Sequence, residues 1–290
     1  MDESVLFSVP VELGGKTYQV EVFKTSAKSR KFKGQKILHP YSFDKSTKNV
    51  KYNDDDTNSE KLRNVSFFGV KHDGSCGALM WNEETQKWIP YARYDIKLKD
   101  GVPVTPTIDI EDKTKPKGKY GYPKIKRARD ISAWIECEPM SIDEDATHWP
   151  HFVPLSEDPN QYKWFQQAFD KSREEIEKLD PKNHGKIITI EYMGKKINGK
   201  PADPIQYETG IVLHNSMGMR IPMELRTFAG FKAIFEKLPI EGLVAYCDDD
   251  TIFKIRSDMF GFNWEKMNPD STKVYGHHGE GMSRDVILKQ

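Results

Sequence analysis

One apolar strand and the turn after it organise this chain: Val65-Ser66-Phe67-Phe68-Gly69-Val70-Lys71-His72-Asp73-Gly74-Ser75. The apolar run predicts a buried strand, and Asp73-Gly74 predicts a turn directly after it. Lysine is a poor nucleophile while it is protonated, and an apolar setting or nearby cations lower its pKa. A buried strand that delivers Lys71 into a turn therefore favours a nucleophilic lysine over a solvated charge. The K-x-D-G pattern alone is weak evidence, and later motifs have to support it.

The composition is that of a globular protein with a polar surface. Of the 290 residues, 37% are apolar, 11% are aromatic and 30% are charged, and the mean hydropathy is −0.70. This length allows one large domain or two small ones. The 44 basic and 44 acidic residues cancel, so no net charge draws the whole protein to nucleic acid or membrane. Polyanion binding would need a local patch.

The three cysteines, Cys76, Cys137 and Cys247, lie far apart in the sequence and form no C-x-x-C pair. This spacing argues against a zinc site and a disulfide framework, and it favours a reducing compartment. The acidic start of the chain lacks a hydrophobic run of signal length, and no stretch approaches ~18 apolar residues. We therefore expect a soluble, intracellular, cytoplasmic monomer with no membrane partner.

Strands paired by hairpins dominate the predicted secondary structure. Residues 9–13 and 18–23 flank Gly14-Gly15 and predict a hairpin, and residues 78–81 are expected to pair with the lysine strand. Further strands are predicted at 88–94, 242–247 and 251–256, helices from Asp158 to Asp180 and at 223–238, and a long connection with short strands at 95–130. This mixture predicts an α+β fold with antiparallel sheets.

Charged residues at the ends of later strands complete a possible reaction centre. Glu191 and Glu241 could hold a divalent cation directly or through its waters. Lys254 and Arg256 are two residues apart in a predicted strand, so they point to one face, where they would meet a phosphate. This inventory fits lysine-centred nucleotidyl transfer, in which an amine attacks the α-phosphorus of a nucleoside triphosphate and pyrophosphate leaves.

Five short motifs follow one another along the chain: Lys71-His72-Asp73-Gly74-Ser75, Ala92-Arg93-Tyr94-Asp95, Glu191-Tyr192-Met193-Gly194-Lys195-Lys196-Ile197-Asn198-Gly199, Ile240-Glu241-Gly242-Leu243-Val244 and Phe253-Lys254-Ile255-Arg256. In type and order they resemble the motifs of the covalent nucleotidyltransferases, the superfamily of DNA ligases, RNA ligases and mRNA capping enzymes. The resemblance covers residues 71–256, which is most of the chain. In the third motif, Glu-x-x-Gly followed by an Asn-Gly turn resembles RNA ligases specifically.

A further stretch is similar to the vertebrate-type ATP-dependent 5′–3′ RNA ligases, which also occur in some large viruses. It reads Pro150-His151-Phe152-Val153-Pro154-Leu155, followed by Asn160-Gln161-Tyr162-Lys163-Trp164. This resemblance implies ATP, Mg²⁺ or Mn²⁺, and the joining of a 5′-phosphate RNA end to a 3′-hydroxyl RNA end. The reaction would pass through lysyl-AMP and an RNA-adenylate.

The resemblance also implies roles for particular residues. Lys71 and Lys254 would be catalytic, Arg93 would touch the nucleotide sugar, and Glu138 would be a third metal candidate beside Glu191 and Glu241. The implied nucleotide-binding set is Lys71, Asp73, Gly74, Arg93, Glu191, Glu241, Lys254 and Arg256. Two alternatives stay open: Asp73 could simply stabilise the turn, and His214 could either stack on adenine or be a structural histidine.

The expected organisation is a nucleotidyltransferase (adenylation) domain at residues 61–260, with antiparallel sheets around a nucleotide cleft. It would carry a Lys/Pro-rich insert at 95–130 and a helical insert at 158–180. A β-rich segment at 1–60 would pack on this domain, and 261–290 would be a C-terminal extension. The 34 residues after Arg256 are too few for the OB domain that DNA ligases and capping enzymes append, so none is expected.

The insert contains the best candidate for an RNA-contacting patch, since phosphates favour dense Lys and Arg and tyrosines can stack on unpaired bases. Its predicted residues are Lys117, Lys119, Tyr120, Lys124, Lys126, Arg127 and Arg129. A solvated lysine loop is the alternative. The rival functions are a capping guanylyltransferase or DNA ligase of the same superfamily, and a non-catalytic RNA-binding or sensor protein.

Overall fold

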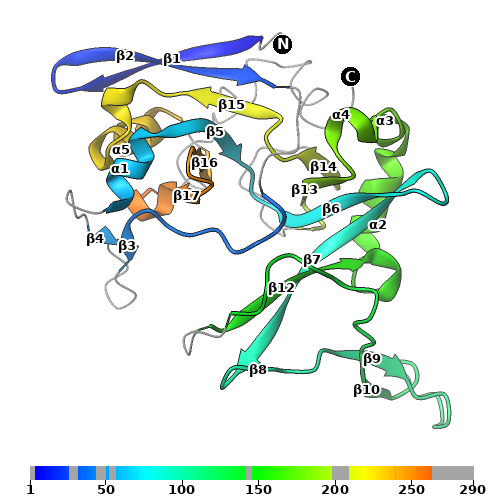
Figure 1. The fold of residues 1–290 in the computed structure, drawn as a ribbon. Helices are drawn as coiled ribbons and strands as arrows, with labels where there is room; N and C mark the ends of the chain where they lie inside the picture. The colour runs from blue at the N-terminus through cyan, green and yellow to red at the C-terminus, as the bar shows by residue number, and fades with distance from the viewer. Residues whose placement is uncertain are drawn as a thin grey trace.

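The computed structural model describes residues 4–25, 32–43, 50–51, 57–141, 146–197, 209–238 and 240–262. Two antiparallel sheets contain most of the described strands, and a few short helices cover them (Figure 1). The prediction of an α+β fold with antiparallel sheets is therefore confirmed. Among the described helices, none is long and apolar enough to cross a membrane.

The first sheet has six strands and carries the lysine strand near its middle. Its order is β1 (Val5–Leu13), β2 (Lys16–Lys24), β15 (Met217–Arg220), β5 (Val65–Lys71), β16 (Gly242–Cys247) and β17 (Ile252–Arg256). The predicted N-terminal hairpin is confirmed as β1 and β2. Since β2 pairs with β15, this hairpin is part of the sheet that holds Lys71.

The second sheet has seven strands. Along its main path it runs β11 (Ile135–Glu136), β12 (His148–Pro154), β7 (Lys87–Lys99), β6 (Ser75–Asn82), β13 (Ile187–Met193) and β14 (Gly210–Leu213), and β8 (Val102–Pro103) pairs with the end of β7. Two smaller sheets are formed by β3 (Ser42–Phe43) with β4 (Val50–Lys51) and by β9 (Thr107–Glu111) with β10 (Lys124–Ala128).

The lysine strand does not form a hairpin with the strand that follows it, so that prediction is wrong. Both edges of β5 are taken, by β15 and β16, and no edge is left for β6. The chain instead crosses at 72–74 from the first sheet to the second, where β6 pairs with β7 and β13. This crossing sets Lys71 at the boundary between the two sheets, as the cyan ribbon in Figure 1 shows.

Each sheet has its own apolar core. Val20, Phe68, Phe231 and Phe253 are among the buried residues of the first, which α5 (Phe228–Lys237) covers. The second core is packed under α2 (Lys163–Lys171) and α3 (Arg173–Glu177), and it includes Tyr192. Short segments complete the fold: α1 (Thr57–Arg63), α4 (Pro181–His184) and the 3₁₀ turns η1 (Leu155–Glu157), η2 (Met223–Leu225) and η3 (Ser257–Phe260).

Both predicted helices are shorter than expected. The first is divided at Ser172, and Asp158 caps no helix: its carboxylate accepts the backbone N–H of Gln161 in a turn. Asp180 begins α4, because its side chain accepts the Lys182 N–H and Pro181 occupies the first helical position. The second helix begins at Phe228, where the Thr227 hydroxyl accepts the Gly230 N–H. The caps at Asp180 and Thr227 thus set helix boundaries that the longer periodic spacing of apolar residues did not predict.

Some predicted features lie outside the described residues. These are the Asn198-Gly199 turn of the third motif, the start of the chain and most of the 261–290 extension.

Candidate functional site

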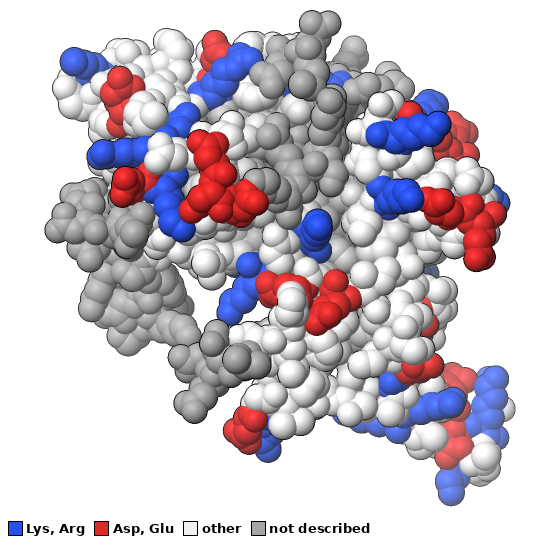
Figure 2. All heavy atoms as spheres, viewed as in Figure 1, with Lys and Arg blue, Asp and Glu red and all other residues white. Residues whose placement is uncertain are grey.

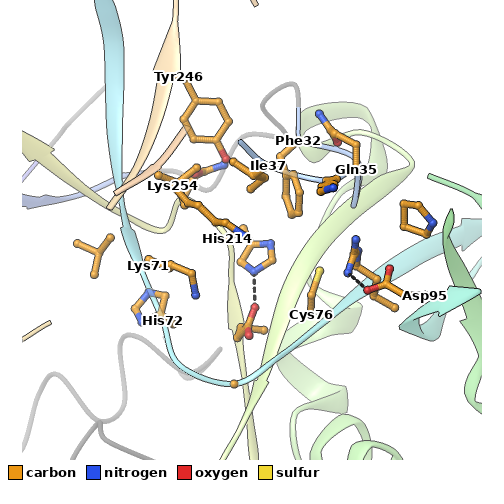
Figure 3. Close-up of a pocket in the computed structure, with 18 of the residues that line it drawn as sticks. Phe32, Gln35, Ile37, Lys71, His72, Cys76, Asp95, His214, Tyr246 and Lys254 are labelled. Atoms are coloured by element: carbon orange, nitrogen blue, oxygen red, sulfur yellow. Dashed lines mark hydrogen bonds and ion pairs between the residues drawn. The ribbon is translucent and has the colours of Figure 1, made fainter. Parts of the chain in front are cut away.

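A cavity of about 410 Å³ lies where the two sheets meet. Its lining includes Lys71 and Lys254 from the first sheet and Arg93 and Glu191 from the second. Figure 3 shows Lys71 and Lys254 extending toward His214 and Cys76 across the cavity. This volume is within the range of small-molecule sites, ~300–1,000 Å³. Residues more than a hundred positions apart in the sequence therefore surround one space.

Lys71 ends β5 and forms an ion pair with Glu241. Its Nζ lies 2.6 Å from Glu241 Oε2, and the Glu241 side chain is 9% exposed. The register brings this pair together, because Lys71 is opposite Gly242, the residue after Glu241. Burial raises the pKa of the Glu241 carboxyl, and the positive charge of Lys71 opposes that shift. A buried proton acceptor is thus in contact with the amine.

Lys254 enters the same cavity from β17. Burial lowers the pKa of its ammonium, and the positive charges of Lys71, Arg256 and Arg93 lower it further. Such a group is repelled by its cationic neighbours until an anion is bound between them. Its backbone N–H donates to the Leu38 carbonyl at 2.9 Å, which holds the strand at that point.

Gly74 allows the crossing chain to pass close to β13. A Cβ atom at this position would lie 2.3 Å from the Tyr192 carbonyl oxygen and 2.8 Å from Glu191 Cγ. Such contacts require the backbone to move, so any larger residue would push the turn away from β13. This glycine therefore helps to bring Lys71 within the same cavity as Glu191.

Glu191 occupies the opposite wall and is 8% exposed. His214 Nε2 lies 2.8 Å from Glu191 Oε2, and the Phe32 ring is 5.5 Å from the His214 ring. Cys76 faces Glu191 directly across the β6–β13 pair. The sequence pattern predicts no role for Cys76 and leaves that of His214 open between adenine stacking and structure. Nothing in the spacing of these residues indicated that β6, β13 and the turn after β14 would set them side by side.

One sulfur, one nitrogen and one carboxylate oxygen from Cys76, His214 and Glu191 lie within 4.8 Å of one another. Cysteine spacing, which indicates no zinc site, could not reveal this group, because only one of its three members is a cysteine. Burial, with the Glu191 charge, raises the pKa of the Cys76 thiol well above its usual range, which favours the protonated form. The group is thus a poor soft-metal site unless a cation displaces that proton.

Arg93 also lines the cavity, but its guanidinium is held by protein groups. Its Nε donates to the Gly34 carbonyl at 2.6 Å, and Nη1 is 3.0 Å from Asp95 Oδ2. Gly34 belongs to residues 32–38, which we call the strap, and Phe32, Gln35 and Ile37 of the strap line the cavity (Figure 3). No motif in the sequence indicated this segment.

Four predicted residues are not part of the cavity lining: Asp73, Glu138, Glu241 and Arg256. Glu241 is connected to the cavity through its ion pair with Lys71. Arg256 is paired with Asp258 at 2.6 Å, although its register beside Gly242 sets it on the same face as Lys71. Glu138 accepts the backbone N–H of Lys36 in the strap at 3.1 Å, so it supports the strap rather than joining the other carboxylates. Asp73 is near enough for its charge to raise the pKa of Glu241.

The predicted RNA patch divides into exposed and buried parts. Lys117, Lys119, Lys124, Lys126 and Arg127 are exposed, as is Tyr120. Arg129 is not available: its side chain is 6% exposed and is paired with Asp158 at 2.7 Å. Its inclusion in the patch is therefore wrong, because a neighbouring carboxylate and two aromatic rings enclose it.

No protein-family model matches this chain. No curated protein sequence matches it either.

Proposed function

We propose that this protein is an ATP-dependent RNA ligase whose two sheets form a nucleotidyltransferase (adenylation) domain of the covalent superfamily. The observation that carries the proposal is that Lys71, Lys254 and Glu191 line one cavity between the sheets and that Lys71 is ion-paired with Glu241. A binding module has no need of a partly buried amine that contacts a carboxylate and shares a cavity with a second lysine. A nucleotidyl-transfer centre needs the amine, the carboxylate and the second lysine together.

In the first step, Lys71 forms the covalent intermediate. Its ammonium gives one proton to Glu241 along the 2.6 Å hydrogen bond, and the raised pKa of that carboxyl suits it as the acceptor. The amine then attacks the α-phosphorus of ATP. The P–N bond forms, the bond to pyrophosphate breaks, and the second proton passes to solvent.

Lys254 stabilises the charge that develops on the α-phosphate. Its ammonium is partly buried and faces the same cavity as Lys71. In a partly desolvated site, a positioned cation is worth far more to a developing oxyanion than it would be in water. The bound phosphate also removes the repulsion between Lys71 and Lys254, so nucleotide binding and correct placement of the two amines support each other.

Mg²⁺ or Mn²⁺ fits this donor set, because both cations prefer carboxylate oxygens. Glu191 and Glu241 are both buried, and the charge of Glu191 contributes to raising the pKa of Glu241. These two carboxylates would hold the ion, directly or through its waters. When bound, the ion shields the negative charge of the triphosphate and of the leaving pyrophosphate.

Two further transfers complete the reaction. An oxygen of the RNA 5′-phosphate attacks the lysyl-AMP phosphorus, the P–N bond breaks, and Glu241 returns a proton to the Lys71 amine. The product is an RNA-adenylate. The 3′-hydroxyl oxygen of the second RNA end then attacks the 5′-phosphorus, its proton passes to solvent, and AMP leaves.

The test uses ATP and GTP, each labelled at the α-phosphate, with RNA that carries a 5′-phosphate and a 3′-hydroxyl. We expect label from ATP on the protein, its transfer to RNA and a joined RNA product. Label from GTP alone would instead indicate a capping guanylyltransferase, and joining of DNA but not RNA a DNA ligase. RNA binding without label from either nucleotide would indicate a non-catalytic RNA-binding protein.

A further inference from the structure

A two-stranded hairpin projects from the second sheet beyond the cavity. We call residues 107–128 the arm: β9 and β10 pair with each other and with no other described strand. The arm follows β7, whose residues Arg93 and Asp95 line the cavity before the strand ends at Lys99. Figure 1 shows the arm at the lower right, extending from the end of the sheet. A strand of nucleic acid leaving the cavity along β7 would therefore meet it.

Neither face of the arm is covered by the described part of the chain. All five residues of β10 are exposed, and in β9 only Ile108 and Ile110 are partly buried. A two-stranded hairpin alone is marginally stable in water. The arm is therefore held at its base and presents the rest of its surface to solvent.

Arg129 supplies that attachment at the base. Its backbone N–H donates to the Pro106 carbonyl at 2.8 Å, closing the two ends of the arm. Its guanidinium contacts Asp158 and Gln161 and lies over the rings of Tyr94 and Trp134. The arm thus has a fixed origin on the body of the protein.

Positive charge is concentrated toward the tip of the arm. Residues 113–127 contain seven basic residues and no acidic one: Lys113, Lys115, Lys117, Lys119, Lys124, Lys126 and Arg127. Figure 2 shows blue side chains gathered over this region at the lower right. On β10, Lys124 is opposite Glu111 and Lys126 is opposite Asp109, which partly offsets their charge. The lysines that have no acidic residue opposite them are therefore those of the loop between β9 and β10.

The tip is a tight turn that presents an aromatic ring. The N–H and C=O groups of Gly118 and Gly121 bond to each other in both directions, at 2.8 and 3.2 Å. Tyr120, inside this turn, is 92% exposed, and Lys119 Nζ lies 5.4 Å from its ring centroid. An ordered turn that leaves a large ring in solvent beside an ammonium matches the pairing of stacking and phosphate contact used for single strands.

We propose that the arm binds an unpaired RNA strand next to the reacting end, an inference that rests on the proposed function. Lys115, Lys117 and Lys119 contact successive phosphates, and Tyr120 stacks on one base. The ring selects an unpaired strand over a duplex, because only an unstacked base exposes its face. The lysines contact phosphates, which carry no sequence information, so the arm binds RNA ends of any sequence.

The test measures binding of an unstructured RNA oligonucleotide that carries a 5′-phosphate, over a series of salt concentrations. One variant reverses Lys115, Lys117 and Lys119 to Glu. Its matched control reverses Lys16, Lys232 and Lys237 to Glu, three exposed lysines on β2 and α5. A second pair compares Tyr120→Ala with Tyr120→Phe, which keeps the stacking ring.

The arm variant is expected to lose at least tenfold in affinity, and the slope of log K against log salt becomes shallower by about 2, at roughly 0.7 per lost phosphate contact. Tyr120→Ala is expected to weaken binding roughly 5- to 150-fold through lost stacking, while Tyr120→Phe stays within twofold of the wild type. A duplex of the same sequence is expected to be insensitive to Tyr120→Ala. The control triple variant is expected to keep most of its affinity.

An unchanged salt slope in the arm variant, or equal effects of the two triple variants, would overturn the proposal. Salt-dependent arm binding to anionic phospholipid vesicles, without binding to RNA, would also overturn it. Self-adenylylation separates this proposal from the proposed function, because the arm does not touch the cavity. An arm variant that still takes up AMP but no longer binds RNA would support both proposals. RNA binding that depends on the arm, in a protein that takes up no AMP, would support the proposal for the arm and contradict the ligase function.

Discussion

The cavity and the arm are both rich in cations, but they hold them differently. In the cavity, Lys71 is paired with Glu241, and Arg93 is bonded to Asp95 and Gly34. On the arm, none of the lysines at 113–126 forms an ion pair with a residue that the structure describes. Paired, partly buried charges are fixed in direction and act in a low dielectric, as transition-state stabilisation requires. Exposed charges adapt to a polyanion whose shape varies. Under the two proposals above, the cavity is the region for chemistry and the arm is the region for RNA binding.

The largest expected difference between the two regions is in formation of the AMP adduct. Lys254→Met removes the cation that faces Lys71 but keeps a side chain of similar length. Loss of one preorganised charge from a transition state costs roughly 10²- to 10³-fold, and we expect that decrease in the single-turnover rate. Lys237→Met, on the exposed end of α5, is the control. A rate within threefold of the wild type for Lys254→Met would remove this lysine from the mechanism.

The base of the arm should matter for stability far more than its tip. Arg129→Ala leaves Asp158 without its partner in a pair whose side chains are 6% and 10% exposed. Breaking a buried pair in this way costs about 3–5 kcal/mol, which urea unfolding would measure. Arg127→Ala, two residues earlier and exposed, should stay within about 0.5 kcal/mol. Equal effects at the two positions would show that Arg129 does not anchor the arm.

Low pH should destabilise the folded protein through His72, which lines the cavity. This side chain is 4% exposed, and burial, with the charges of His214 and Lys71, lowers its pKa to about 3. The unfolded chain takes up this proton below about pH 6.5 and the folded chain does not. His72 therefore costs stability as the pH falls from about 6.5 toward 3, by about 1.4 kcal/mol per pH unit.

The variant His72→Asn is expected to flatten the dependence of the unfolding free energy on pH in this window. The arm contains no histidine and contributes nothing of this kind. Denaturant titrations at several pH values would measure the slope. Parallel curves for variant and wild type would contradict the burial of a neutral His72.

The smallest expected effect is that of the arm lysines on stability and on formation of the AMP adduct. Reversal of Lys115, Lys117 and Lys119 to Glu should change the unfolding free energy by less than about 0.5 kcal/mol, because these side chains are exposed. The rate of AMP-adduct formation should stay within twofold of the wild type. A large loss in either quantity would mean that the arm supports the cavity and is not a separate binding surface.

Much of the secondary structure and the gathering of the cavity residues could be predicted from local patterns. The alternation around Gly14-Gly15 predicted β1 and β2, and the apolar run before Lys71 predicted β5. The resemblance of five ordered motifs to the covalent nucleotidyltransferases implied that Lys71, Glu191, Glu241 and Lys254 would come together. These features depend on short-range periodicity or on several weak motifs in a fixed order.

What the sequence could not reveal depends on contacts between distant segments. The partner of β6 was mispredicted because a turn signal predicts a reversal and not which sheet the next strand joins. The strap was missed because its role depends on backbone groups, such as the Gly34 and Leu38 carbonyls. Every residue has such a carbonyl, so the residue type does not predict the contact. Arg129 resembled its lysine neighbours until the fold enclosed it beside Asp158.

Intact-mass measurement after incubation with ATP and Mg²⁺ or Mn²⁺ tests the central claim most directly, followed by peptide mapping of any adduct. The expected result is one AMP per chain, on the peptide that contains Lys71, and none in Lys71→Ala or Lys71→Arg, both of which should remain folded. An adduct at another residue, an adduct that persists in Lys71→Ala, or no adduct with either cation would contradict it.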